Sequence, residues 1–180
     1  GFGFRETHRY VPGGFGDRLA WIRRPGSGGE EGLLAILDAF AGLDVVGIAE
    51  DGTPREAGFV PFLRGNDLVT GAGFIAVARM ERGVDLYDTT VETTPILRGR
   101  IDAFSTIRDV AIWEDRILAA PDGRRWVRFF DVTNLDSPRE IARVHPWDEE
   151  RPFLEAVEVT GNTVAVAGRG RGVRLLDARP

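Results

Sequence analysis

A six-residue motif recurs along this chain and constrains its fold more than any other feature. It reads Gly-Val-Asp-Leu-Tyr-Asp at 83–88, Trp-Val-Arg-Phe-Phe-Asp at 126–131, Gly-Val-Arg-Leu-Leu-Asp at 172–177 and, more weakly, Gly-Leu-Asp-Val-Val-Gly at 42–47. The starts are 41, 43 and 46 residues apart (42 to 83, 83 to 126, 126 to 172). A period in the low forties is typical of a repeated unit of four strands. The sequence therefore predicts an all-β protein built from four such units.

Each motif is preceded by a predicted hairpin and followed by a predicted outer strand. In the second repeat, the apolar runs 68–70 and 74–78 flank a Gly-Ala-Gly turn, which is typical of a hairpin. Residues 33–37 have helical spacing in isolation, but they align with 74–78 at the offset of 41, so we predict a strand there. Thr-Pro or Ser-Pro pairs at 53, 94 and 137 open the outer strands, where proline is tolerated because an edge needs no N–H donor.

We predict one domain, residues 1–180, that forms a β-propeller of four four-stranded blades. The blades span about 17–62, 66–104, 108–146, and 155–177 plus 4–12. The N-terminal residues are assigned to the last blade because 5–12 match 139–146 in length and punctuation. An N-terminal strand in the last blade would close the ring and hide two sheet edges. In the alternative, two chains share a larger ring, so both a monomer and a homodimer remain open.

Composition narrows the classes of function. The chain has no cysteine, which excludes disulfides, thiolate metal sites and a cysteine nucleophile. Its net charge of −5 argues against a nucleic-acid partner. Its apolar runs are shorter than the roughly 20 residues of a membrane span, so we expect no membrane insertion.

Residues 157–177, with Val-Glu-Val-Thr-Gly-Asn-Thr-Val-Ala-Val-Ala-Gly before the last motif, resemble the LVIVD-type repeat of bacterial and archaeal surface or secreted propellers. Residues 131–138, Asp-Val-Thr-Asn-Leu-Asp-Ser-Pro, resemble the turn that usually follows that repeat. The resemblance covers nearly the whole chain, but Gly47 replaces the closing Asp and Trp126 the opening Gly. It implies a β-propeller in an extracytoplasmic location, at the cell surface or secreted. It transfers no catalytic residue, and most members have more than four blades.

Arginines gather in the predicted loops between the second and third strands of three repeats. Each of these loops carries two: Arg79 and Arg82, Arg124 and Arg125, and Arg169 and Arg171. Trp147 lies in a connection between repeats, which we expect on the same face. Arginine binds carboxylates and phosphates through two parallel hydrogen bonds. We therefore predict a non-catalytic recognition or scaffold protein that binds a protein or an anionic small ligand here. The alternative is that these arginines pair with nearby acids and only keep the protein soluble.

Two further functions are weighed against this one. We expect Trp147 to be exposed because it lies in a connection, and it could then belong to a carbohydrate-binding propeller. Alternatively, the chain could be an enzyme with its site at the mouth of an axial channel, built from acids of the connections such as Asp17, Asp67, Asp109 and Glu155. The sequence predicts no catalytic residue, cofactor or metal ligand set, because His8 and His145 fall on outer strands and no serine has a partner to activate it. The motif's closing Asp88, Asp131 and Asp177 are expected to bind turn N–H groups.

Overall fold

The computed structural model describes residues 6, 8–11, 16–22, 32–38, 41–61, 63–90, 94–123, 125–147 and 153–178. In this part of the chain the strands form four antiparallel sheets, each in plain chain order. The first sheet contains β1 (Gly16–Ile22), β2 (Gly32–Asp38), β3 (Gly42–Ile48) and β4 (Pro54–Pro61). The second contains β5 (Asp67–Gly71), β6 (Phe74–Ala78), β7 (Val84–Asp88) and β8 (Ile96–Ile101). The third contains β9 (Ala111–Trp113), β10 (Ile117–Asp122), β11 (Trp126–Asp131) and β12 (Arg139–Val144). The fourth contains β13 (Leu154–Thr160), β14 (Thr163–Gly168) and β15 (Gly172–Asp177).

The prediction of an all-β protein of four repeated sheets is confirmed. The motif forms the third strand of every sheet, and residues 33–37 lie in β2 as the repeat register predicts. The described residues contain no helix of the length and apolarity that a membrane crossing requires.

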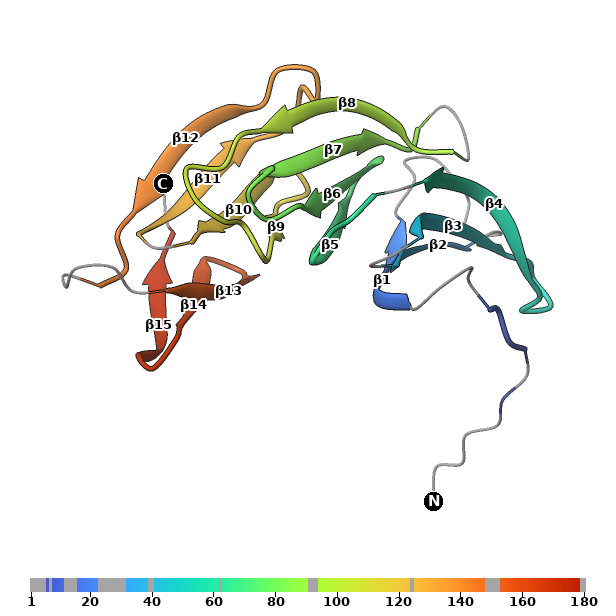
Figure 1. Cartoon of the computed structure of the whole chain (residues 1–180), viewed down its shortest axis with the longest axis horizontal. Helices are drawn as coiled ribbons and strands as arrows, with labels where there is room; N and C mark the ends of the chain where they lie inside the picture. The colour runs from blue at the N-terminus through green and yellow to red at the C-terminus, as the bar shows by residue number, and fades with distance from the viewer. Residues whose placement is uncertain are drawn as a thin grey trace.

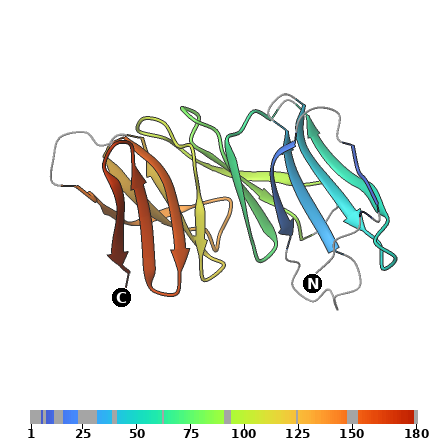
Figure 2. The same ribbon diagram turned by 90° about the horizontal axis from the view of Figure 1, so that it is seen from below.

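The four sheets follow one another along an open arc (Figures 1 and 2). The fourth strands β4, β8 and β12 lie along the convex rim, and the first strands lie toward the concave side (Figure 1). First strands of successive sheets are neighbours, as β1 contacts β5, β5 contacts β9 and β9 contacts β13. The first and fourth sheets stand at opposite ends of the arc.

Each sheet packs face to face on the next, and side chains alternate between the two faces because strands have a period of two. We call the face toward the next sheet in the chain the front face and the opposite one the back face. Leu43 and Val45 on the front of the first sheet share a core with Ile75 and Val77 on the back of the second. Two more cores of the same kind join the second sheet to the third and the third to the fourth. The fold is held by three repeat-equivalent apolar junctions.

The predicted closure of the ring by residues 4–12 is not seen in the described part of the chain, where the fourth sheet has three strands and residues 8–11 lie outside any strand. Residues 4, 5, 7 and 12 lie outside the described residues. His8 lies beside Gly52, since a Cβ there would be 3.3 Å from its Nδ1. Burial and the carboxylates of Asp44 and Glu56 raise the pKa of Tyr10. These contacts place His8 and Tyr10 on the first sheet, at the far end of the arc from β15.

Candidate functional site

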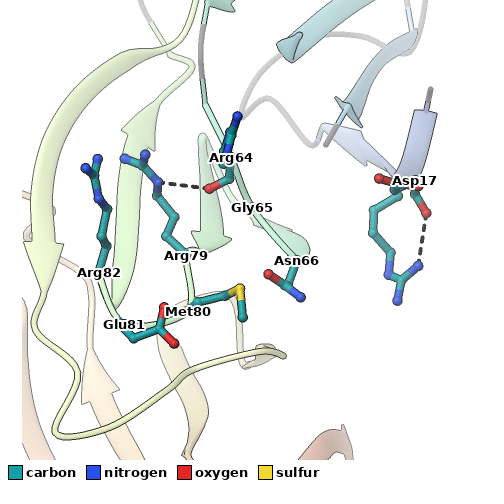
Figure 3. A pocket seen from close by; sticks show the side chains of 9 residues that line it. Asp17, Arg64, Gly65, Asn66, Arg79, Met80, Glu81 and Arg82 are labelled. Atoms are coloured by element: carbon teal, nitrogen blue, oxygen red, sulfur yellow. Dashed lines mark hydrogen bonds between the residues drawn. The ribbon is translucent and has the colours of Figure 1, made fainter. Parts of the chain in front are cut away.

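A pocket of about 830 Å³ opens between the first and second sheets, at the loop end where several predicted site residues lie. Three segments line it: the start of β1, the connection from β4 to β5, and the β6–β7 loop. They contribute Asp17, Arg18, Arg64, Gly65, Asn66, Arg79, Met80, Glu81 and Arg82. Figure 3 shows Arg79 and Arg82 extending from the loop in the same direction, near Arg64. We call this site the Arg pocket.

The β6–β7 loop is held firmly, which fixes the arginines that it carries. Met80 exchanges two backbone hydrogen bonds with Ile107, of 2.9 and 3.0 Å, and so ties the loop to the connection that precedes the third sheet. Gly83 ends the loop at a φ of +83°, where a Cβ would lie 1.8 Å from the carbonyl oxygen of Ile101. Only glycine fits that position without displacing the backbone.

Arg79 is committed to a buried ion pair. Its guanidinium binds the carboxylate of Asp85, which is fully buried and also accepts a 2.6 Å hydrogen bond from Arg100. The Arg79 Nε donates to the carbonyl of Arg64 at 3.1 Å, which orders the pocket wall. Burial and the charge of Asp85 raise the pKa of Tyr87 to about 12, so its hydroxyl stays protonated. Arg79 therefore shapes the pocket and does not offer a free charge.

Arg64 and Arg82 are the available cations of the Arg pocket. Both residues are exposed, and neither forms an ion pair with an acid in the described part of the chain. Arg18 is partly committed, with its Nε 3.3 Å from Asp67. The pocket thus carries at least two guanidinium groups on a firm backbone, a chemistry that suits carboxylate or phosphate oxygens.

The other predicted arginines do not join this pocket. Arg125 lies over the Trp126 ring at 5.3 Å, and Arg169 approaches Glu155 at 3.5 Å in the loop of the fourth sheet. Arg171 is exposed in that same loop, and Arg124 lies outside the described residues. Among the described members of the predicted set, Arg79 and Arg82 are the two that line this pocket.

Sequence reasoning missed Arg18 and Arg64. The signal for Arg64 was available, because connections between repeats were expected on the same face as the arginine loops. Arg18 had no comparable signal, since it lies within β1 and reaches the pocket only through the packing of the first sheet on the second.

The prediction that Trp147 is exposed is wrong. Its side chain is 6% exposed and belongs to the core between the third and fourth sheets. A Cβ on Gly168 would lie 2.9 Å from the indole, so the absence of a side chain lets the ring lie on β14. The guanidinium of Arg174 covers the ring at 5.7 Å, within the range of a cation–π contact. The residue that motivated a carbohydrate platform is therefore part of the core.

The acids considered for an enzymatic site tie the inner strands together. Asp67 accepts the Val110 N–H at 3.2 Å, and Asp109 accepts the Val157 N–H at 2.6 Å, so each carboxylate holds the first strand of the following sheet. Burial and a hydrogen bond with Asp67 raise the pKa of Asp109 to about 7. Asp17 lies in the Arg pocket and Glu155 pairs with Arg169, so the four acids do not converge.

The closing aspartates of two motifs bind turn N–H groups as predicted. Asp88 accepts from Thr90 N at 2.8 Å and Asp131 from Thr133 N at 3.0 Å. These bonds and those from the threonine hydroxyls lower the pKa of both carboxyls. Within the described ranges, no group of three or more His, Asp or Glu side chains is placed to hold a metal ion.

Comparison with known proteins gives the fold alone. No family model and no curated protein matches the chain. The computationally designed Ika4 protein is 12% identical, with a TM-score of 0.60 over 97% of this chain and 99% of that one. The designed Ika8 protein is 11% identical, with a TM-score of 0.58 over 87% of this chain but only 46% of its own. A chain of the COPII outer coat vertex on membranes is 12% identical, with a TM-score of 0.57 over 76% of this chain and 40% of its own.

Proposed function

We propose that this chain is a non-catalytic recognition or scaffold module that binds an acidic protein surface or an anionic small ligand in the Arg pocket. The observation that carries the proposal is the state of Arg64 and Arg82. Both are exposed on the wall of one open pocket, and neither is neutralised by an acid of the described chain. An anionic group that enters the pocket gains charge-assisted hydrogen bonds without first breaking an internal ion pair.

The rest of the pocket supports binding rather than reaction. Arg79 and Asp85 fix one wall, and the Met80–Ile107 hydrogen bonds fix the loop. A preformed wall lowers the ordering cost of binding because fewer side chains must be immobilised. At about 830 Å³ the pocket has the size of a small-ligand site and is also wide enough for the acidic side chains of a peptide.

We further propose that the four sheets are blades of a β-propeller of the LVIVD-repeat type, located at the cell surface or secreted. The propeller is supported by the regular period of the sequence motif and by the packing of each sheet on the next through equivalent apolar junctions. The support for the repeat type and the location is the resemblance of residues 157–177 alone.

The test is a binding titration of two fluorescent probes, an oligoglutamate peptide and a phosphopeptide of otherwise neutral sequence, followed by anisotropy. The double variant Arg64→Glu/Arg82→Glu removes both available cations and is expected to weaken binding at least tenfold, since hydrogen bonds to charged groups contribute about 1.5–3 kcal/mol each. The matched control is the double variant Arg169→Glu/Arg171→Glu, which makes the same charge change in the loop of the fourth sheet. Equal loss in both proteins would mean that net charge and not the Arg pocket attracts the probe. Unchanged binding in the double variant would refute the site.

A further inference from the structure

The fourth sheet exposes apolar side chains at positions that are buried in the other three. Val173 and Leu175, the second and fourth residues of its motif, are 65% and 71% exposed. Their equivalents in the second sheet, Val84 and Leu86, are 0% exposed. The equivalents in the first and third sheets are also buried: Leu43, Val45, Val127 and Phe129. The front face of the fourth sheet therefore has the composition of a junction but no sheet against it.

The first sheet has the reciprocal feature on its back face. Leu19 is 68% exposed and Trp21 is 57% exposed, and both lie in β1. The repeat equivalents of Leu19 are Leu68, Val110 and Val157, and all three are buried. Leu34 and Ile36 of β2 share this face and are only half-buried, although the equivalents of both in the second sheet, Ile75 and Val77, are 0% exposed. The β1 and β2 part of an apolar back face is thus exposed at the other end of the arc, beside the β3 part of that face, where Tyr10 lies near Asp44.

These two faces are of opposite kinds and fit one another. At all three internal junctions a front face packs on a back face. At each junction the equivalent of Leu175 and the equivalent of Leu19 share one core: Val45 with Leu68, Leu86 with Val110, and Phe129 with Val157. Within one chain the two free faces stand at opposite ends of the arc and do not meet (Figure 1).

We propose that two copies of this chain close a ring of eight sheets, in which the front face of each fourth sheet packs on the back face of the partner's first sheet. The contact is head-to-tail, and such contacts either close a ring or extend into a filament. The arc matches 46% of the Ika8 chain and 99% of the Ika4 chain, so its fold occurs both as part of a longer chain and as almost the whole of one. A second copy supplies both missing neighbours at once, because it presents both kinds of free face. This inference concerns the end faces and does not depend on the Arg pocket.

The test uses the absence of cysteine from the chain, which makes each introduced thiol unique. Packed sheets are about 10 Å apart, a span that a short bis-maleimide bridges. A mixture of Leu175→Cys and Leu19→Cys chains is expected to give a cross-linked dimer on a denaturing gel. The matched control uses Leu97→Cys in place of Leu19→Cys. Leu97 is also apolar and is 48% exposed, but it lies on the outer strand β8 of an internal sheet, so this mixture is expected to give no cross-linked dimer.

The double variant Leu19→Cys/Leu175→Cys distinguishes the possible assemblies. Cross-linking that stops at the dimer supports the closed ring. A ladder of larger products would show an open filament, and a link within one chain would show closure by a single copy; either overturns the proposal. Because all substitutions are at exposed positions, circular dichroism should match the parent, and an absence of cross-linking in folded protein also overturns it. The charge insertion Leu175→Glu should abolish the dimer, whereas Leu97→Glu should not.

Discussion

The buried carboxylate of Asp85 provides the sharpest test of how the second sheet and the Arg pocket are held together. It is fully buried, pairs with Arg79, whose side chain is 10% exposed, and accepts a 2.6 Å hydrogen bond from Arg100. We consider Asp85→Asn, which keeps the size of the side chain and removes its charge. The Arg79 guanidinium then remains buried without a counter-ion.

Breaking a buried ion pair from one side costs about 3–5 kcal/mol, because the remaining charge is left desolvated. For a domain of 180 residues, 1 kcal/mol shifts the melting temperature by roughly 2–4 °C. We therefore expect Asp85→Asn to lower it by about 6–20 °C. The matched control is Asp136→Asn, whose carboxylate makes an exposed pair with Arg98 at 2.9 Å. Exposed pairs contribute about 0–1 kcal/mol, so the control should melt within a few degrees of the parent.

Urea unfolding followed by circular dichroism measures both free energies. The third sheet suggests a rescue, since it carries the same pair with reversed polarity, Asp122 with Arg128, at the repeat-equivalent positions. The third member there is the acid Glu140, which occupies the position equivalent to Leu97, while the equivalent of Arg100 is Arg143. The inverted triple Arg79→Asp/Asp85→Arg/Leu97→Glu should therefore be more stable than Asp85→Asn. A loss below 1 kcal/mol in Asp85→Asn, or a triple variant less stable than the single one, would refute this account of the buried pair.

Three further predictions follow from the structure. The pKa of Asp109 is raised from about 4 in the unfolded chain to about 7, so the folded state holds an extra proton between these pH values, and the stability that this group contributes is lost as the pH rises through 7. The stability of Asp109→Asn relative to the parent should therefore be greater at pH 8 than at pH 5. Chemical denaturation that shows no such pH difference would contradict this. Gly83→Ala should lower the free energy of unfolding by at least about 2 kcal/mol more than Gly170→Ala does. Both glycines have a positive φ, but a Cβ at Gly83 would lie 1.8 Å from a backbone oxygen, while a Cβ at Gly170 has nothing within 4 Å. Equal unfolding free energies of the two variants would contradict this. Trp147→Ala should lose about 3–5 kcal/mol by thermal unfolding, whereas an exposed tryptophan would lose little.

The repeat made much of the fold predictable. Residues 33–37 have helical spacing, yet their register with 74–78 placed them correctly in β2, because a repeated unit must present the same faces to its neighbours. The loop positions of Arg79 and Arg82 followed from the same register. The i to i+6 pairing of Arg79 with Asp85 lies across one hairpin and could also have been deduced from it.

The remaining features depend on contacts that no local pattern encodes. Trp147 follows an outer strand in a connection, and its burial depends on Gly168, which lies 21 residues later and leaves room for the ring. Residues 5–12 match the outer strand at 139–146, but that likeness does not decide which sheet they meet. The described residues 8–11 lie by the first sheet, where Tyr10 lies near the carboxylates of Asp44 and Glu56.

The central claim is that the four sheets are equivalent units whose two free faces cover one another between two chains. Sedimentation equilibrium of the unmodified chain over a wide concentration range tests it most directly. The account predicts a single species of twice the 19.8 kDa chain mass at every concentration. A stable 19.8 kDa monomer at the highest soluble concentration would contradict it, and so would a mass that keeps rising with concentration.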